Sequence, residues 1–316
     1  MIVVCGEALV DVFVGADTAD GVALEGRVGG SPFNVAVGLA RLGRPVAFFG
    51  AISRDFLGER LMRSLQAERV DTRTTARVDA PTTLGLVGLD AQGVPSYSFY
   101  GARGADRQLG VEALDLLPTP LRALHIGSFA TVVEPVASTL RALVERERGG
   151  SFLSCDPNVR LNVEPDVGLW ARTLQWCLAR AQLLKISAED LALLRPGVEA
   201  RVFAEEALRQ GVRLVVVTHG SAGAAGWTAS AAASVPPFAI EVIDTVGAGD
   251  AFQAALLAWL SERGLLEADL DLTPAALADA LRFASAAAAL TCSRRGAALP
   301  RRAELEAFVQ DTRWAT

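Results

Sequence analysis

Residues 244–252 read "DTVGAGDAF", and this stretch decides how the rest of the chain is interpreted. Two glycines and an alanine lie between Asp244 and Asp250, and the apolar helical run "AFQAALLAWL" follows at once. The N–H groups at a helix start lack partners within the helix and attract anions. Small side chains also let a phosphate group approach the backbone closely. The stretch therefore predicts an anion site at the start of a helix, formed by Gly247, Ala248 and Gly249.

Asp250 needs its own explanation, because a carboxylate beside a phosphate is repulsive. One interpretation is a helix cap, but Thr245 or Asp244 could fill that role instead. The other is a base that accepts the proton of a hydroxyl group as its oxygen attacks phosphorus. The positive end of the helix dipole should lower the pKa of Asp250 and weaken it as a base. Phosphoryl transfer tolerates a weak base, since it depends mostly on positioning and charge stabilisation.

Composition limits the other classes of protein. The chain has 316 residues, is 51% hydrophobic and carries a net charge of -6, which indicates a globular protein and argues against nucleic-acid binding. The single lysine, Lys185, precedes Ile186, which excludes a Walker A motif. Four scattered cysteines and two histidines suggest reduced thiols in a cytoplasmic protein and no Cys/His metal site. We expect neither a signal peptide nor a membrane span.

Strand-like and helix-like runs alternate along most of the chain. This pattern predicts an α/β fold, a mostly parallel sheet with helices on both faces. Residues of about 10–30 and 78–105 break the rhythm and predict a small inserted β element, including two strands around a turn at 91–93. Ligands bind beyond the carboxyl ends of strands in such folds, and the polar segments collect there.

Four segments together resemble the ribokinase-like (PfkB) carbohydrate kinases. They are "GGSPFNVAVGLARLG" at 29–43, "GAISRDFLG" at 50–58, "VTHGSAGA" at 217–224 and "DTVGAGDAF". The resemblance covers nearly the whole chain. Within the family it is strongest to bacterial fructokinases, through "GEALVD", "FYGARGADR", "LHIGSF" and "DPNVR". It implies one kinase domain over 1–316, with the β insertion as a lid, and a sugar kinase that uses ATP, Mg²⁺ and, as in many relatives, K⁺.

The resemblance also implies roles for individual residues. Asp250 would be the catalytic base, Gly247 to Gly249 the anion hole, and Arg160 a phosphate clamp, although a surface salt bridge is its simpler interpretation. The implied sugar-binding residues are Asp11, Gly29, Gly30, Asn34, Phe99 and Arg103. The implied ATP-binding residues are Lys185, Ser187, Thr218, Gly220, Gly223 and Ala287. Asn158 and Asp190 would hold Mg²⁺ through water, and a monovalent cation would lie near Asp244, Val246, Ala287 and Gly296.

Two departures from the usual patterns bear on these roles. Ser187 and Asp190 stand where many relatives have an Asn-x-x-Glu pattern, and the shorter Asp190 would alter the water around Mg²⁺. Arg103 in "FYGARGADR" also departs from the commoner fructokinase form and could contact an acidic sugar. Asn34 has a simpler interpretation as a helix N-cap.

We expect a fructokinase that forms fructose 6-phosphate. A 2-keto-3-deoxygluconate kinase, or another PfkB sugar or nucleoside kinase, is the alternative. Two other classes remain: a dinucleotide-dependent oxidoreductase, from the glycine-rich run at 215–226 with Glu241, and an inactive sugar sensor on the same fold. We also expect a homodimer joined through the apolar outer face of the lid, near Leu84, Leu86 and Phe99.

Overall fold

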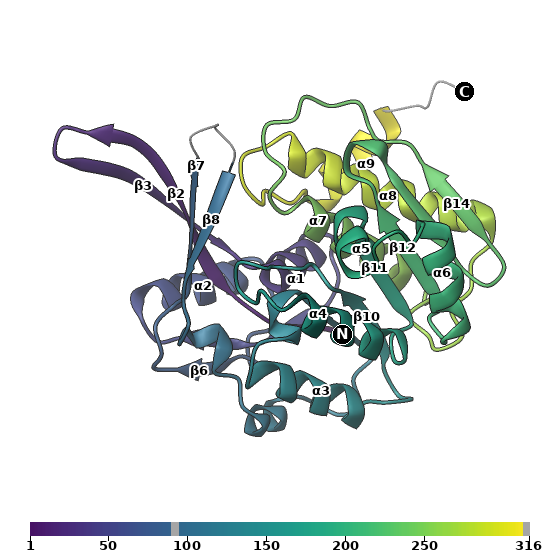
Figure 1. The fold of residues 1–316 in the computed structure, drawn as a ribbon, viewed down its shortest axis with the longest axis horizontal. Coiled ribbons are helices and arrows are strands. Elements are labelled where there is room, and N and C mark those ends of the chain that lie inside the picture. The colour runs from purple at the N-terminus through teal and green to yellow at the C-terminus, as the bar shows by residue number, and fades with distance from the viewer. Residues whose placement is uncertain (90–94, 312–316) are drawn as a thin grey trace.

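The computed structural model describes residues 1–89 and 95–311 and contains one large sheet (Figure 1). Its eight strands have the order β14-β13-β12-β11-β10-β9-β1-β4, parallel from β12 to β4 and antiparallel at the β13 and β14 edge. The strands are β1 (Ile2–Cys5), β4 (Val46–Phe49), β9 (Ala123–Gly127), β10 (Phe152–Asp156), β11 (Leu183–Ser187), β12 (Leu214–Thr218), β13 (Ala224–Trp227) and β14 (Ala232–Val235). The predicted α/β architecture is confirmed.

Helices cover both faces of this sheet, because successive strand residues point to opposite sides. In β1, Ile2 and Val4 pack into one hydrophobic cluster and Val3 and Cys5 into the other. The first cluster holds α1 (Ser31–Arg41), α2 (Phe56–Ala67), α7 (Ala248–Glu262), α8 (Pro274–Cys292) and α9 (Arg302–Asp311). The second holds α3 (Val136–Arg146), α4 (Val167–Leu178), α5 (Ala188–Leu194) and α6 (Ala200–Arg209). Short helical turns are η1 (Ala105–Arg107), η2 (Val111–Leu116), η3 (Ser128–Thr131) and η4 (Gly220–Ala222).

Helices α1 and α7 pack directly against each other, although they lie more than two hundred residues apart in sequence. A Cβ atom on Gly38 would come within 2.6 Å of the Ala254 Cβ, so glycine is what allows this close approach. Helix α1 follows "GG" and α7 contains "AGDAF". The packing therefore brings the two most distinctive segments of the sequence to one place.

A second sheet of four strands, in the order β3-β2-β7-β8, projects from the large one (Figure 1). Its strands are β2 (Leu9–Thr18), β3 (Gly21–Gly29), β7 (Leu84–Leu89) and β8 (Pro95–Tyr100), and a separate pair joins β5 (Ala51–Ser53) to β6 (Ala76–Val78). The turn expected at 91–93 lies outside the described residues.

The two faces of the second sheet differ. Asp11 and Phe99 share the inner face, since a Cβ on Gly85 between them would lie 2.9 Å from Asp11 Oδ1 and 3.3 Å from a Phe99 ring carbon. The outer face exposes Val14, Leu24 and Tyr100. Placing Phe99 on the outer face was therefore wrong, because strand alternation turns it inward.

Helix α8 corrects the expectation that no segment is long and apolar enough to span a bilayer. By length and composition alone, its 19 residues could do so. Its Leu277, Leu281 and Ala284 are instead buried in the same hydrophobic cluster as α7, which accounts for the apolar composition through core packing.

Candidate active site

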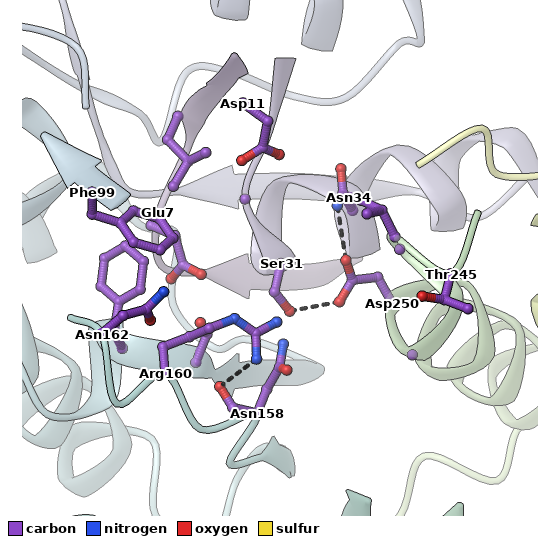
Figure 2. A pocket seen from close by; sticks show the side chains of 17 residues that line it. Glu7, Asp11, Ser31, Asn34, Phe99, Asn158, Arg160, Asn162, Thr245 and Asp250 are labelled. Carbon is purple, nitrogen blue, oxygen red and sulfur yellow. Dashed lines mark hydrogen bonds between the residues drawn. The ribbon is translucent and has the colours of Figure 1, made fainter. Parts of the chain in front are cut away.

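A cavity of about 410 Å³ lies beyond the carboxyl ends of β1, β9 and β10, beside the inner face of the second sheet (Figure 2). The second sheet contributes Asp11 and Phe99. The loops after β9 and β10 contribute Ser128, Phe129, Asn158, Arg160 and Asn162. The start of α1 and the segment leading into α7 complete it with Gly30, Ser31, Asn34, Thr245, Val246, Gly247, Gly249 and Asp250.

The loop before α7 places two of the three residues predicted to form an anion site at the cavity. Gly247 is the N-cap residue of α7, and Gly247 and Gly249 line the cavity. Ala248 does not line it, and its N–H donates to the carbonyl of Thr245 at 3.2 Å. The expected run of outward-facing amides from Gly247 to Gly249 is therefore interrupted at Ala248.

Neither Thr245 nor Asp244 caps α7. Among the described residues, no side chain forms a capping hydrogen bond at its N-terminus, where Gly247 is the N-cap residue. Asp244 instead accepts hydrogen bonds from the N–H groups of Val246 at 3.0 Å and Gly296 at 2.7 Å. These bonds hold the loop in shape and bring together three of the four residues expected around a monovalent cation. Ala287 lies in the buried core, where its carbonyl accepts from the Thr291 hydroxyl.

Asp250 is 7% exposed and sits where α1 meets α7. Its two carboxylate oxygens accept hydrogen bonds from the Ser31 hydroxyl at 2.7 Å and from the Asn34 amide at 2.8 Å (Figure 2). Burial raises the pKa of Asp250 above its usual value, and these two bonds with the charges of Arg160 and Lys185 oppose the rise. The expectation of a lowered pKa was wrong, because the loss of water outweighs the helix dipole.

Asn34 contacts Asp250, which neither of its expected roles, sugar binding or helix N-cap, included. Its amide nitrogen donates to the carboxylate of Asp250, so Asn34 orients that carboxylate and also lines the cavity. The N-cap interpretation was wrong, because α1 begins at Ser31 and its N-cap residue is Gly30. Ser31 was missed by sequence reasoning, although it lies between "GG" and Asn34 in a segment that was singled out.

The inner face of the second sheet places a carboxylate opposite Asp250. Burial raises the pKa of Asp11 to about 6, with the Arg160 charge opposing and Asp250 adding to the rise. A Cβ on Gly29 would lie 2.5 Å from Asp11 Oδ2, and one on Gly30, whose φ is 107°, would lie 2.7 Å from the Glu7 carbonyl oxygen. Gly30 is thus required for the helix start to approach the backbone of Glu7, whereas a side chain on Gly29 would displace the Asp11 carboxylate.

Arg160 is the one lysine or arginine among the described residues that line the cavity. Its guanidinium donates to the carbonyl of Val159 at 2.9 Å, and its charge acts on both Asp11 and Asp250. No described acidic side chain forms an ion pair with it, so the surface salt-bridge interpretation fails. Asn158, two residues earlier, has a φ of 43° and also lines the cavity.

Lys185 lies buried beneath the start of α7. Its ammonium group contacts Asp156 at 2.7 Å, and a Cβ on Gly249 would lie 3.1 Å from it. Ser187 caps α5 by accepting the N–H of Asp190 at 3.0 Å. Asp190 accepts the N–H of Val159 at 3.3 Å, and burial raises its pKa to about 6. Asp156 was missed by sequence reasoning, which assigned roles only to Asn158 and Arg160 of the segment "DPNVR".

The remaining predicted residues lie away from the cavity lining. Thr218 ends β12, and Gly220 and Gly223 flank the turn between β12 and β13. Because β13 pairs antiparallel with β12, this run forms a hairpin and not the βαβ unit that binds dinucleotides, so the oxidoreductase interpretation was wrong. Arg103 is exposed and does not line the cavity.

Comparisons with known proteins agree with this geometry. A family model described as pfkB family carbohydrate kinase matches residues 1–304. A fructokinase of Rhizobium leguminosarum bv. trifolii is 36% identical over 266 residues, covering 84% of this chain and 81% of the relative. The chain belongs to the pfkB family of carbohydrate kinases. It is a sugar phosphotransferase, as the resemblance predicted.

Two solved structures match nearly the full length. A fructokinase from Xylella fastidiosa with bound ATP has a TM-score of 0.88 at 29% identity, covering 98% of each chain. A fructokinase from Vibrio cholerae O395 in a form with fructose, ADP and calcium ion bound has a TM-score of 0.81 at 30% identity, again over 98% of each chain. The predicted ribokinase-like fold is confirmed.

Proposed function

We propose that the chain transfers the γ-phosphoryl group of ATP to D-fructose, forming fructose 6-phosphate and ADP. The observation that carries this proposal is Asp250, a buried carboxylate that lies beside the glycine-rich start of α7 and lines a cavity of about 410 Å³. This chain is similar to several fructokinases over most of their length. The structure of one of them contains ATP, and that of another contains fructose and ADP.

The reaction needs little covalent chemistry from the protein. The sugar hydroxyl loses its proton to Asp250 as its oxygen bonds to the γ-phosphorus. The bond from that phosphorus to the bridging oxygen breaks, and its electron pair leaves with ADP. Gly247 and Gly249 at the start of α7, with Arg160, stabilise the charge on the transferred group. Closure of the cavity over the sugar would limit transfer to water.

We propose that Mg²⁺ accompanies the ATP phosphates. Among the described residues, no group of three or more His, Cys, Asp or Glu side chains could hold a metal ion. Asn158 and Asp190 therefore fit a role through bound water, with the phosphates as direct ligands. A monovalent cation such as K⁺ fits the loop that Asp244 organises with Val246 and Gly296. We place the enzyme in the cytoplasm, where ATP and reduced thiols occur.

The test of the sugar is a steady-state screen of fructose, ribose, 2-keto-3-deoxygluconate and nucleosides with MgATP. We expect fructose to have the highest kcat/KM. Arg103→Ala should change the KM for fructose by less than about threefold, because an exposed side chain outside the cavity contributes little. Preferred turnover of the acidic sugar, with strong dependence on Arg103, would establish the alternative kinase. Sugar binding without turnover would indicate the inactive sensor.

We also propose that the second sheet is a lid that covers the sugar and that its outer face joins two copies of the chain. On that face Leu24 is 59% and Tyr100 62% exposed, which is unusual for large apolar side chains on one sheet. We expect sedimentation at micromolar concentration to show a dimer, and Leu24→Lys to shift it toward monomer. Val202→Lys on α6, where Val202 is 45% exposed, is the matched control and should leave the dimer intact. A wild-type monomer would rule out this interface.

A further inference from the structure

Glu7 is a buried acid in the cavity wall that the phosphoryl-transfer reaction leaves without a role. It follows β1, is 1% exposed and lines the cavity. Its Oε2 atom has no hydrogen-bond partner among the described residues. An unpaired buried polar atom is costly, and in a cavity wall a bound ligand can supply the missing partner.

The position of Glu7 shows which part of a ligand it would meet. Figure 2 places Glu7 with Phe99 and Asn162 on one side of the cavity, and Asp250 with Asn34 on the other. The hydroxyl that receives the phosphoryl group must lie at Asp250. Glu7 therefore faces the part of the sugar that does not react.

We propose that Glu7 is a specificity residue, whose unpartnered Oε2 binds a hydroxyl group of the sugar at the end of the cavity away from Asp250. The inference rests on the proposed fructose kinase activity. A hydroxyl group suits this position because it can both donate and accept, as a carboxyl group can.

The protonation of Glu7 supports this role. Burial raises its pKa to about 8, and nearby Asp106 adds to the rise, while hydrogen bonding from Ser128 and the charge of Arg160 oppose it. Asp106 itself is buried and accepts from the Thr83 hydroxyl. Below its pKa Glu7 is a neutral acid that donates a hydrogen bond, and above it the donor is lost. The hydrogen bond then runs from the sugar hydroxyl to the carboxylate, so sugar binding should change as the pH passes through that value.

The test compares Glu7→Gln, which stays neutral and keeps a donor and an acceptor, with Glu7→Met, which has neither. At neutral pH we expect Glu7→Gln to stay close to wild type in the KM for fructose. Glu7→Met should raise it by about ten- to a hundredfold, with a smaller change in kcat. Glu147→Gln is the matched control, since Glu147 is also buried but lies outside this cavity, and it should leave the KM unchanged.

Analogues of the sugar identify the contact. 1-Deoxy-D-fructose lacks the 1-hydroxyl group, and 2,5-anhydro-D-mannitol lacks the 2-hydroxyl group. For one of them, the difference in KM between wild type and Glu7→Met should nearly vanish. In addition, the wild-type KM for fructose should change as the pH passes through about 8, and that change should be absent in Glu7→Gln.

Each result decides the proposal. A Glu7→Met variant that is folded and binds fructose like wild type would overturn it. So would an equal rise in KM, from wild type to Glu7→Met, for fructose and for both analogues. If Glu7→Met fails to fold, the pH dependence of wild type against Glu7→Gln remains decisive, and identical profiles would overturn the proposal. A wild-type enzyme that does not phosphorylate fructose refutes the proposed function instead. The same comparisons then apply to the sugar that turns over.

Discussion

Replacing Asp250 with asparagine should lower kcat by about 10² to 10⁴, the range for loss of a general base. The variant should keep its fold, because an asparagine amide can still accept from Asn34 and contact the Ser31 hydroxyl. Removing a buried charge also relieves the desolvation that raises the pKa of Asp250. The measurement is steady-state kcat with fructose and MgATP, together with the melting temperature and the affinity for ATP. Turnover close to wild type in a folded variant would exclude Asp250 as the base.

The pH dependence gives an independent check on the same residue. Asp250 must be ionised to accept a proton, so kcat/KM should fall as the pH decreases through its pKa. The Ser31 hydroxyl bonds to the ionised form and lowers that pKa. Ser31→Ala should therefore move the acidic limb of the profile to higher pH while leaving the plateau closer to wild type than Asp250→Asn does. An unmoved limb would assign that ionisation to another group.

The sequence alone was sufficient to locate the proposed reaction centre but not to describe its electrostatics. "DTVGAGDAF" carries a glycine-rich helix start and a carboxylate in nine residues, so local chemistry identified Asp250. The direction of its pKa shift was wrong because burial depends on α1, whose Ser31 and Asn34 pack over it from more than two hundred positions away. Local rules, such as the effect of a helix dipole, do not contain that contact.

Glu7 and Asp156 were missed by sequence reasoning for the same reason. Glu7 and Asp156 each follow or end a buried strand and look like ordinary strand-end acids. Their significance comes from three-dimensional placement: Glu7 against Gly30 and Asp156 against Lys185. Phe99 shows that three-dimensional placement also decides which way a strand residue points. An alternating strand has two faces, and the sequence does not say which face meets the cavity.

Gly247→Ala should be nearly as damaging as the loss of the base, with kcat reduced by about 10² to 10³, the effect of removing one donor from an oxyanion hole. Gly247 has a φ of 78°, and a Cβ there would lie 2.6 Å from the Ala297 Cβ and 2.9 Å from the Ala297 Cα. Part of that contact is backbone, held by the bond from the Gly296 N–H to Asp244, so the start of α7 must move instead.

The matched control for this change lies at the other end of the same helix. Gly264 follows α7 with a φ of 71°, and a Cβ there would meet no atom of the described residues within 4 Å. Gly264→Ala should cost the same backbone strain, about 1–2 kcal/mol of stability, and leave kcat unchanged. Kinetics and thermal unfolding of both variants separate strain from displacement of the anion site. If Gly247→Ala lowered kcat no more than Gly264→Ala does, the fixed position of the α7 start would have no part in phosphoryl transfer.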